Sequence, residues 1–390
     1  MIIDALARYA AEDPRSLAMI VNLAPVSYAD LWRGIGVLET RIKDAAIPRG
    51  ARVGVAIADL RLAWFAILAL EKMGYPTFAV PQNARVSQLS LANVGAILTD
   101  GQPHGTAVID GGVAIVDVSK GSNAPSPGMG GATSRPEMER YVLFSSGTTG
   151  FHKKVQLTGA LRDRRLQSQI RRRAYGPQTR HFIGSLGPWT VHGYLGPLSI
   201  WAQGGAIIFH QIADVISAIA ATKPNRLFAT PGLAEDWMRQ MGKSRIDASA
   251  MRISVGGGPM SPSLWVAMQE AFRGGQFFQV YGTTECGGIS DTQIRSETDL
   301  GRFELNGETE LQVTDPDGNP MPAGAMGAVR VRSDLMVKQY LDDPAASAVF
   351  FRDGWFYPGD MGVIGHDGRL TLTGRFAEVI NMRGDKIAPG

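Results

Sequence analysis

The sequence predicts a layered α/β protein with a small, mainly antiparallel β subdomain toward its C-terminal end. Strand-like and helix-like runs alternate over most of the chain, which is typical of parallel strands joined by helices. From Thr309 onward, short alternating strands separated by turns replace that pattern. The 47 glycines and 22 prolines also indicate many tight turns between short elements.

The first third of the chain follows a strand–helix–strand order. The apolar run 60–73 is long enough for a helix, and Gly74 directly after it is a typical C-terminal stop. The stretch 119–136 is rich in glycine, proline and serine, so it is expected to be a flexible surface connection. Short apolar runs predict strands at 53–57, 77–80, 96–99, 114–118 and 141–144.

A second α/β stretch is expected from about 181 to 289. Its predicted elements are strands at 206–209 and 226–230 and helices at 215–222 and 262–272. The β subdomain that follows is predicted from strands at 310–314 and 328–332, which are separated by turn residues.

Composition excludes several classes of function. Because 39 Lys and Arg balance 36 Asp and Glu to a net charge of +3, nucleic acid and membrane surfaces are disfavoured as partners. The single cysteine, Cys286, excludes a disulfide framework and a cysteine-based zinc site. The N-terminus lacks the features of a signal peptide, and the apolar run 62–70 is far shorter than the roughly 20 residues of a membrane span. We therefore expect a cytoplasmic protein.

One loop has the composition of a phosphate-binding loop. The strand at 141–144 leads into Ser145-Ser-Gly-Thr-Thr-Gly150, and Lys153 follows shortly after. Small residues let backbone N–H groups converge, while hydroxyls and the lysine add donors and positive charge. The loop does not contain G-x-x-x-x-G-K-[ST], so a P-loop kinase or GTPase is disfavoured. Alone, the segment would also suit an ordinary hairpin with solvated lysines.

Three further motifs follow in order: Gln279-Val-Tyr-Gly-Thr-Thr-Glu285, Gly354-Trp-Phe-Tyr-Pro-Gly-Asp360 and Gly374-Arg375. Together with the loop they resemble the adenylate-forming superfamily, which comprises acyl-CoA synthetases, luciferases and adenylation domains. The resemblance implies an acyl-CoA synthetase-like large domain with two α/β layered subdomains and a small β-barrel-like subdomain. Its implied parts are about 1–180, 181–305 and 306–376, with 377–390 as the hinge and truncated start of a C-terminal lobe.

The resemblance also implies a site for ATP. Thr148, Thr149 and Lys153 would hold the β- and γ-phosphates. Tyr281 would stack on the adenine, and Asp360 would accept hydrogen bonds from the ribose hydroxyls. The implied nucleotide-binding residues are Ser146, Gly147, Thr148, Thr149, Gly150, Lys153, Gly257, Gly258, Tyr281, Gly282, Thr284, Asp360 and Arg375.

Lys153, Thr284 and Glu285 would carry the catalysis. Thr284 would contact the α-phosphate, and Glu285 would coordinate a Mg²⁺ ion between itself and the phosphates. Arg375 would reach the ribose or phosphates from the far side.

Each of these residues also has an ordinary structural interpretation. A tyrosine after a strand usually packs in the core, and a lone glutamate at a turn is usually solvated. Asp360 alone would suit a turn or a helix cap, and Arg375 a surface ion pair. The run Gly256-Gly-Gly-Pro259, which resembles the turn that lines the adenine, equally suits a plain strand-to-helix turn.

The chain departs from the family pattern at three positions. His152 and Lys154 stand where proline and glycine usually flank the loop lysine, and Pro358 stands where a threonine usually precedes the ribose aspartate. We hypothesise that the cations beside Lys153 strengthen the hold on the triphosphate or on pyrophosphate. A solvated Lys154 side chain is the alternative.

The acid-binding pocket is expected between 187–193 and the glycine-rich turns. The family motif leaves open whether Trp189 or His192 gates the pocket, and His192 equally suits a satisfied core histidine. Gly256, Gly287 and Gly288 would form the opposite wall, and Cys286 would be a small wall residue. Bulky residues facing glycines suggest a small or flat acid.

The strongest charge cluster consists of seven arginines between Arg162 and Arg180. A solvated helix face is the favoured interpretation. The alternative is a docking patch at Arg171–Arg173 for the 3′-phosphate of CoA or for an acidic carrier protein.

The implied reaction is attack of a carboxylate oxygen on the α-phosphorus of ATP, which gives an acyl-adenylate and pyrophosphate, with CoA as the favoured acceptor. An acyl-AMP ligase or an adenylation domain that loads a carrier protein is the alternative, and a non-catalytic nucleotide-binding relative is the third. The family's adenylation lysine has no counterpart within these 390 residues, because Lys386 lies in a different motif. We therefore expect slow adenylation and little thioester formation.

Overall fold

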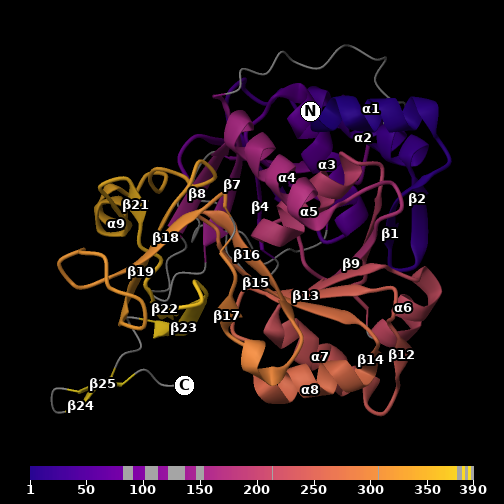
Figure 1. Ribbon diagram of the computed structural model, residues 1–390. Coiled ribbons are helices and arrows are strands. Elements are labelled where there is room, and N and C mark those ends of the chain that lie inside the picture. Colours follow the sequence, from indigo (N-terminus) through magenta and orange to yellow (C-terminus); the bar gives the residue numbers. More distant parts are fainter. Residues whose placement is uncertain are drawn as a thin grey trace. The chain divides into compact units, whose positions relative to one another are not determined.

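The structure is a computed structural model, and its described residues form two compact units (Figure 1). The N-terminal unit comprises Met1–Ile212 and Ala221–Pro224, and the C-terminal unit comprises Ala213–Ala220 and Asn225–Gly390. The described residues are 1–81, 91–101, 113–121, 137–145, 153–212, 214–305, 307–375, 380–382 and 385–387. Among them, no helix combines the length and the apolar character that crossing a membrane would need.

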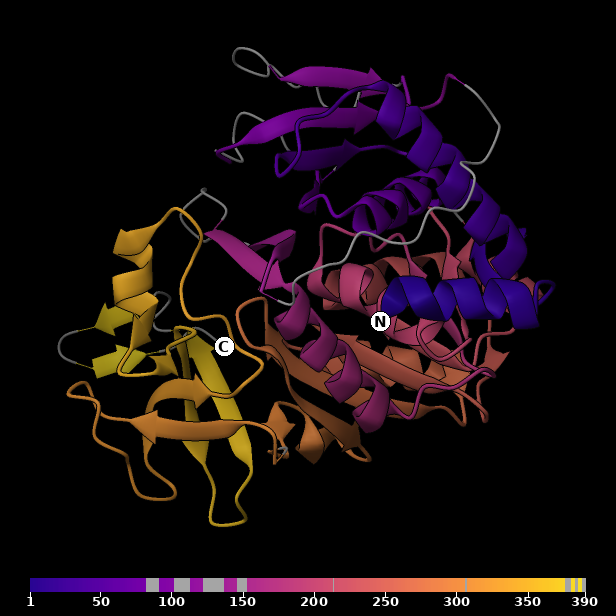
Figure 2. The same cartoon turned by 90° about the horizontal axis from the view of Figure 1, so that it is seen from above.

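The N-terminal unit contains a six-stranded sheet in the order β6-β5-β3-β4-β7-β8. All neighbours are parallel except β7 and β8, which form an antiparallel pair. Figure 2 draws the strands from β3 to β6 in indigo to purple and the β7–β8 pair in magenta. Their bounds are β3 (Arg52–Ala56), β4 (Thr77–Ala79), β5 (Val94–Thr99), β6 (Ala114–Asp117), β7 (Glu139–Ser145) and β8 (Lys153–Thr158).

The central helix of this unit, α3 (Leu60–Met73), has the predicted bounds. It begins because the Asp59 carboxylate accepts hydrogen bonds from the N–H groups of Arg61 and Leu62. It ends because Gly74 takes the left-handed conformation, with φ of 82°, that closes a helix C-terminus. The predicted strand–helix–strand order is confirmed. Most of 119–136, predicted to be a flexible connection, lies outside the described residues.

The same unit contains a second set of strands in the order β9-β10-β1-β2. Aromatic side chains fill the core beside them: the rings of Tyr141 and Tyr194 stack with centroids 3.6 Å apart, and Trp64 packs edge-on against Trp201. The remaining elements of the unit are β1 (Leu17–Val21), β2 (Ala24–Ser27), β9 (Arg180–Gly184), β10 (Ala206–Phe209), α1 (Ile2–Glu12), α2 (Tyr28–Asp44), α4 (Gly159–Arg173) and α5 (Val191–Trp201).

The arginine cluster on α4 is neither a single solvated face nor a single exposed patch. Arg162, Arg165 and Arg173 are buried, whereas Arg164 and Arg171 are exposed. The guanidinium of Arg162 lies 2.7 Å from the carboxylate of Glu71 at the end of α3. Both cluster interpretations are therefore wrong for the buried members: Arg162 pairs with Glu71, and Arg173 donates to the hydroxyl of Tyr175.

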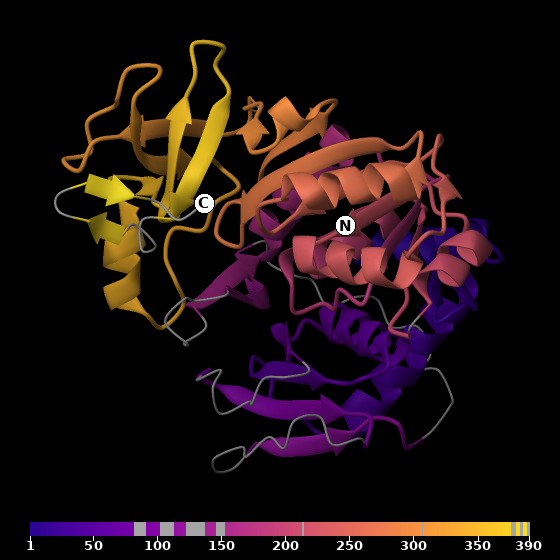
Figure 3. The same cartoon turned by 90° about the horizontal axis from the view of Figure 1, so that it is seen from below.

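The C-terminal unit contains strands in the order β16-β15-β13-β11, parallel except for the antiparallel hairpin of β15 and β16. Figure 3 shows α7 and α8 side by side along this part of the chain. The elements are α6 (Val215–Thr222), β11 (Arg226–Ala229), α7 (Pro231–Met241), β12 (Ile246–Asp247), β13 (Arg252–Gly256), α8 (Pro262–Ala271), β14 (Phe272–Arg273), β15 (Gln276–Thr283) and β16 (Gly287–Ile294).

A seven-stranded, antiparallel sheet follows in the same unit, as predicted from the change of pattern at Thr309. Its strands run β17-β23-β22-β19-β21-β20, and β18 pairs with β19. The elements of this part of the chain are η2 (Glu297–Asp299), β17 (Arg302–Phe303), β18 (Glu310–Thr314), β19 (Met326–Arg332), α9 (Pro344–Phe350), β20 (Phe351–Arg352), β21 (Trp355–Phe356), β22 (Asp360–Ile364) and β23 (Leu370–Arg375). β24 (Ile380–Met382) and β25 (Asp385–Ile387) form a separate antiparallel pair.

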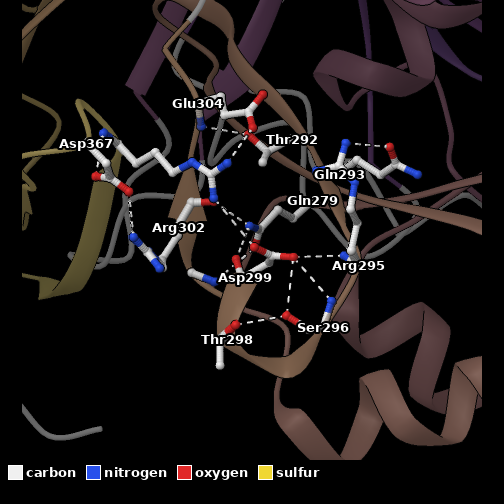
Figure 4. A network of polar contacts seen from close by, with 12 residues as sticks. Gln279, Thr292, Gln293, Arg295, Ser296, Thr298, Asp299, Arg302, Glu304 and Asp367 are labelled. Atoms are coloured by element: carbon white, nitrogen blue, oxygen red, sulfur yellow. Dashed lines mark hydrogen bonds and ion pairs between the residues drawn. The ribbon is translucent and has the colours of Figure 1, made fainter.

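A polar network ties β15 to the beginning of this antiparallel sheet (Figure 4). The Gln279 amide donates to the carbonyl oxygens of Asp299 and Arg302, both at 2.6 Å, and accepts from the N–H of Gly301 at 2.9 Å. The Asp299 carboxylate accepts from the backbone N–H groups of Arg295 and Ser296. These donors, the N–H of Arg295 above all, hold the pKa of Asp299 below its usual value. The Gln279 side chain therefore fixes the segment 299–302, which leads into β17.

Gly54 offers a test of the packing in the six-stranded sheet. A Cβ atom at this position would lie 2.4 Å from Cδ1 of Ile97 and 2.7 Å from the ring of Phe78. We expect Gly54→Ala to destabilise the protein by about 1–3 kcal/mol, because overpacking forces its neighbours to shift. Thermal unfolding should show a lower Tm, whereas Gly232→Ala in α7, with no atom near the added carbon, should leave Tm unchanged or slightly higher. Equal Tm values would contradict this packing.

Asp299 offers a test of the polar network through pH. Because its folded-state pKa is lowered, its contribution to stability is fully present above the unfolded value of about 3.9 and is lost as pH falls through the folded value. We expect Asp299→Ala to lower Tm at pH 7 and the difference from the unsubstituted chain to shrink below about pH 4. A Tm difference that is constant from neutral to acidic pH would show that the carboxylate charge plays no part.

Candidate functional site

A buried tyrosine and a buried aspartate come together with an exposed arginine in the C-terminal unit. The phenol of Tyr281, on β15, donates to one oxygen of Asp360 at 2.6 Å, and Nε of Arg375 lies 3.0 Å from the other oxygen. The register of β22 and β23 pairs Asp360 directly with Arg375, and Gly359, with φ of 84°, shapes the turn just before it. One residue from each of the three motifs, Tyr281, Asp360 and Arg375, therefore meets the others at one carboxylate.

The electrostatics of this group favour a neutral tyrosine. Burial, followed by the negative charge of Asp360, raises the pKa of Tyr281 well above its usual value, so its phenol keeps its proton. Only the guanidinium reaches solvent to any extent, with about half of the Arg375 side chain exposed. The interpretation of Asp360 as a helix cap is wrong, and the ion pair expected of Arg375 is made with Asp360 itself.

The second acidic residue, Glu285, lies in the turn between β15 and β16. Gly282 makes this turn tight: a Cβ atom there would lie 2.5 Å from the carbonyl oxygen of Gly287. Gly287 in turn has φ of 73°, a conformation that side chains other than glycine rarely adopt. Two of the predicted glycines are thus needed to form the turn that presents Thr284 and Glu285.

Glu285 is buried, so its interpretation as a solvated turn glutamate is wrong. Only 6% of the residue is exposed. The phenol of Tyr340 donates to its carboxylate at 2.8 Å, and the N–H of Val337 donates to its backbone carbonyl at 2.9 Å. Tyr340 was not predicted as a site residue, because a lone tyrosine between Gln339 and Leu341 carries no chemical pattern.

The donor set around Glu285 fits one kind of metal site. Within the described ranges, no group of three or more His, Cys, Asp or Glu is placed to hold a metal ion. A single carboxylate suits Mg²⁺, which is commonly held by one or two carboxylates while phosphates and water supply its other ligands. The residues present therefore fit a metal that arrives with a polyphosphate, and they do not fit a metal held by protein alone.

The three successive glycines that begin at the last residue of β13 are explained by different structural constraints. A Cβ atom on Gly256 would lie 2.9 Å from Cβ of Val280 on β15, so this glycine permits close strand packing. Gly257 has φ of 88°. A Cβ atom on Gly258 would make only ordinary contacts, the nearest 3.4 Å away at Pro231. Packing thus explains Gly256, and turn geometry explains Gly257. At Gly258, by contrast, the packing would allow a side chain.

The phosphate-loop residues Ser146, Gly147, Thr148, Thr149 and Gly150 lie outside the described residues, as does His152. Lys153 opens β8 opposite Ser145, and Lys154, the next residue, is buried with 8% exposure. Successive side chains of a strand point to opposite faces, so Lys153 and Lys154 leave β8 in opposite directions. This alternation weighs against the binding of one phosphate by both lysines, and the burial of Lys154 weighs against its solvated alternative.

The two candidate gate residues, Trp189 and His192, belong to the N-terminal unit. The indole of Trp189 covers Gly187, where a Cβ atom would lie 2.1 Å from the ring. His192 Nδ1 lies 3.3 Å from the Arg173 guanidinium, and its Nε2 lies 3.0 Å from Nε2 of His181. Arginine only donates, so Nδ1 of His192 accepts, and its proton lies on Nε2 and is donated to His181.

This order of protons keeps His192 neutral. Burial, and then the positive charge of Arg173, lower its pKa well below the usual value. A neutral ring with both nitrogens engaged cannot accept a proton from a substrate. The satisfied-histidine interpretation is therefore confirmed for these contacts, while the identity of the pocket gate stays a prediction.

Comparison with known proteins identifies a family. The sequence model of the AMP-binding enzyme family matches residues 6–341. 4-coumarate–CoA ligase 2 of Nicotiana tabacum is 26% identical over 65% of this chain and 50% of its own length. Enterobactin synthase component E of Escherichia coli (strain K12) is 24% identical over 99% of this chain and 77% of its own length. The chain thus spans about half the length of the tobacco ligase.

Solved structures show the same fold. O-succinylbenzoate coenzyme A synthetase (MenE) from Bacillus subtilis, in complex with ATP and magnesium ion, aligns with a TM-score of 0.86 at 21% identity, covering 99% of this chain and 82% of its own. ATP-bound MatB from Rhodopseudomonas palustris aligns with a TM-score of 0.87 at 19% identity, covering 100% and 82%. The predicted acyl-CoA synthetase-like α/β fold is confirmed.

The contact between Tyr281 and Asp360 can be tested by a double-mutant cycle. Tyr281→Phe keeps the ring but removes a donor to a buried carboxylate, so we expect a loss of about 1.5–3 kcal/mol in the free energy of unfolding. In an Asp360→Asn background the same change should cost much less, because no charge remains to be satisfied. Chemical denaturation of the four proteins measures both values, and additive losses would contradict the proposed contact.

Proposed function

The chain belongs to the AMP-binding enzyme family, and from this premise we propose that it activates a carboxylic acid with ATP through an acyl-adenylate. The observation that supports this most is the pair of buried acidic residues from two separate motifs. Asp360 receives hydrogen bonds from Tyr281 and Arg375, and Glu285 receives one from Tyr340. Buried carboxylates held by fixed donors are prepared for binding, because they need little reorganisation when a ligand arrives.

We assign the roles as the motifs imply. Asp360 accepts the ribose hydroxyls, and the Tyr281 ring stacks on the adenine. Thr284 contacts the α-phosphate, and Lys153 with the loop 146–150 neutralises the β- and γ-phosphates. Gly257, Gly258 and Gly282 let the backbone approach the nucleotide. Arg375 reaches the ribose or phosphates.

Glu285 would hold Mg²⁺, which when bound neutralises phosphate charge. A carboxylate oxygen of the acid attacks the α-phosphorus, and pyrophosphate leaves. No side chain of the protein is required as a nucleophile, so catalysis rests on positioning and charge neutralisation. Cys286, buried directly after Glu285, is a wall residue of the acid site in this proposal.

The acid is proposed to be small or flat, with CoA as the acceptor. Trp189 or His192 on one side and Gly256, Gly287 and Gly288 on the other would enclose it. The relatives include a 4-coumarate–CoA ligase and a feruloyl-CoA synthase, whose names describe flat aromatic acids. An adenylation enzyme that loads a carrier protein is the second candidate, because enterobactin synthase component E aligns over 99% of this chain.

The organisation of the chain stays part of the proposal. We propose α/β subdomains at about 1–180 and 181–305, a β subdomain at about 306–376, and a hinge with the beginning of a further lobe at 377–390. The 390 residues by themselves are proposed to adenylate slowly, and a cytoplasmic location fits the use of ATP and CoA.

An ATP–pyrophosphate exchange assay across a panel of carboxylic acids tests this function. We expect slow exchange that depends on a flat aromatic acid and is absent with long fatty acids. Glu285→Gln should lower the exchange rate by about 100-fold, because a site for the neutralising metal is lost. Glu310→Gln removes an exposed partner of Arg332 and should leave the rate unchanged.

Two outcomes would contradict the proposal. If the chain binds ATP but no acid raises the rate of ATP–pyrophosphate exchange, the non-catalytic nucleotide-binding alternative is indicated. Exchange that increases with the chain length of fatty acids would overturn the assignment of a flat acid. Transfer of the activated acid to CoA or to a carrier protein then distinguishes the two acceptors.

A further inference from the structure

The segment 337–351 holds the turn that contains Glu285 at two points. The N–H of Val337 donates to the carbonyl oxygen of Glu285 at 2.9 Å, and the phenol of Tyr340 donates to its carboxylate at 2.8 Å. Both residues that form the side-chain contact are buried, with 2% exposure for Tyr340 and 6% for Glu285. A hydrogen bond to a charged group in such surroundings is stronger than one at the surface.

Tyr340 is itself fixed from three directions. Its backbone N–H donates to the hydroxyl of Ser347 at 2.9 Å, and this hydroxyl donates to the carbonyl oxygen of Asp343 at 2.6 Å. The Tyr340 ring packs edge-on against the rings of Phe350 and Phe351, with centroids 5.9 Å and 5.2 Å away. A side chain held in this way restricts the carboxylate to which it donates.

We propose that Tyr340 is a positioning residue for Glu285. Its phenol engages one carboxylate oxygen, and this orients the carboxylate to bind Mg²⁺ together with the phosphates of ATP. This inference rests on the proposed function, because it assumes that Glu285 is the magnesium ligand. The phenol of Tyr340 is the donor in this contact, and the carboxylate of Glu285 is the acceptor. It touches neither substrate nor metal in this role.

The test measures ATP affinity with excess Mg²⁺ and with EDTA. In the unsubstituted chain, Mg²⁺ should strengthen ATP binding. Tyr340→Phe keeps the ring and its packing, so we expect it to reduce this magnesium-dependent gain by about tenfold while metal-free ATP binding changes less than about twofold. Tyr28→Phe is the matched control, because the Tyr28 phenol is equally buried and donates to the carbonyl oxygen of Gly205. It should leave the gain unchanged.

The combination with Glu285→Gln separates positioning from general stability. If Tyr340 acts through Glu285, Tyr340→Phe should cause no further loss of the magnesium-dependent gain in the Glu285→Gln background. Should Tyr340→Phe not fold, Ser347→Ala replaces it, with an expected loss of about threefold. It removes the acceptor of the Tyr340 N–H together with the hydroxyl that donates to the Asp343 carbonyl oxygen, and it leaves the Tyr340 phenol in place.

The outcomes distinguish this inference from the proposed function. If the unsubstituted chain shows no magnesium-dependent ATP binding, the proposed function fails and this inference fails with it. If the magnesium-dependent gain is present and Tyr340→Phe retains it, the inference is overturned and the proposed function stands. The same holds if Tyr340→Phe lowers only Tm, as the Tyr28→Phe control does, and leaves the gain unchanged. Independent losses in the double variant would also overturn it.

Discussion

The cost of burying a carboxylate organises the C-terminal unit. An ionised Asp or Glu removed from water is tolerated only when donors replace its hydration. Asp360 meets this requirement with Tyr281 and Arg375, and Glu285 meets it with Tyr340. The two tyrosines lie 79 and 55 residues from the carboxylates to which they donate, so each carboxylate links separate segments of the unit, whereas Arg375 comes from the adjacent strand of the same hairpin. A change that displaces one donor leaves a buried charge, which explains why these groups sit on regular strands and a tight glycine turn.

The same donors also prepare the site for a ligand. A carboxylate that is already oriented loses little conformational freedom when a hydroxyl or a metal arrives, so more of the contact energy remains for binding. The N-terminal unit uses a different arrangement, in which Arg173, His192 and His181 form a chain of hydrogen bonds with a single direction. These hydrogen bonds fix the orientation of the histidine rings without a charge on the rings. The carboxylates of the C-terminal unit, in contrast, provide negative charge.

Local signals in the sequence predicted local structure well. The bounds of α3, including its stop at Gly74, follow from an apolar run and a helix-closing glycine. β16 was not predicted, because Gly287-Gly-Ile-Ser-Asp-Thr-Gln-Ile294 mixes glycine and polar residues and is a strand only through its pairing with β15. The burial of Arg162 was also missed, since its partner Glu71 lies on another helix. For the site, the motifs supplied the residue types, whereas the contact of Tyr281 with Asp360, 79 residues apart, is a property of the fold.

The pairing of Asp360 with Arg375 across β22 and β23 limits how this part of the chain can change in length. Side chains alternate between the two faces of a strand, so a one-residue insertion in the connection at 365–369 would shift the register and turn one partner to the opposite face. Lengthening the loop by two residues would preserve the faces but would still move the partners along the strands. The hairpin can therefore tolerate substitutions at its tip far better than insertions or deletions, and homologous chains should keep the number of residues between this acid and this base.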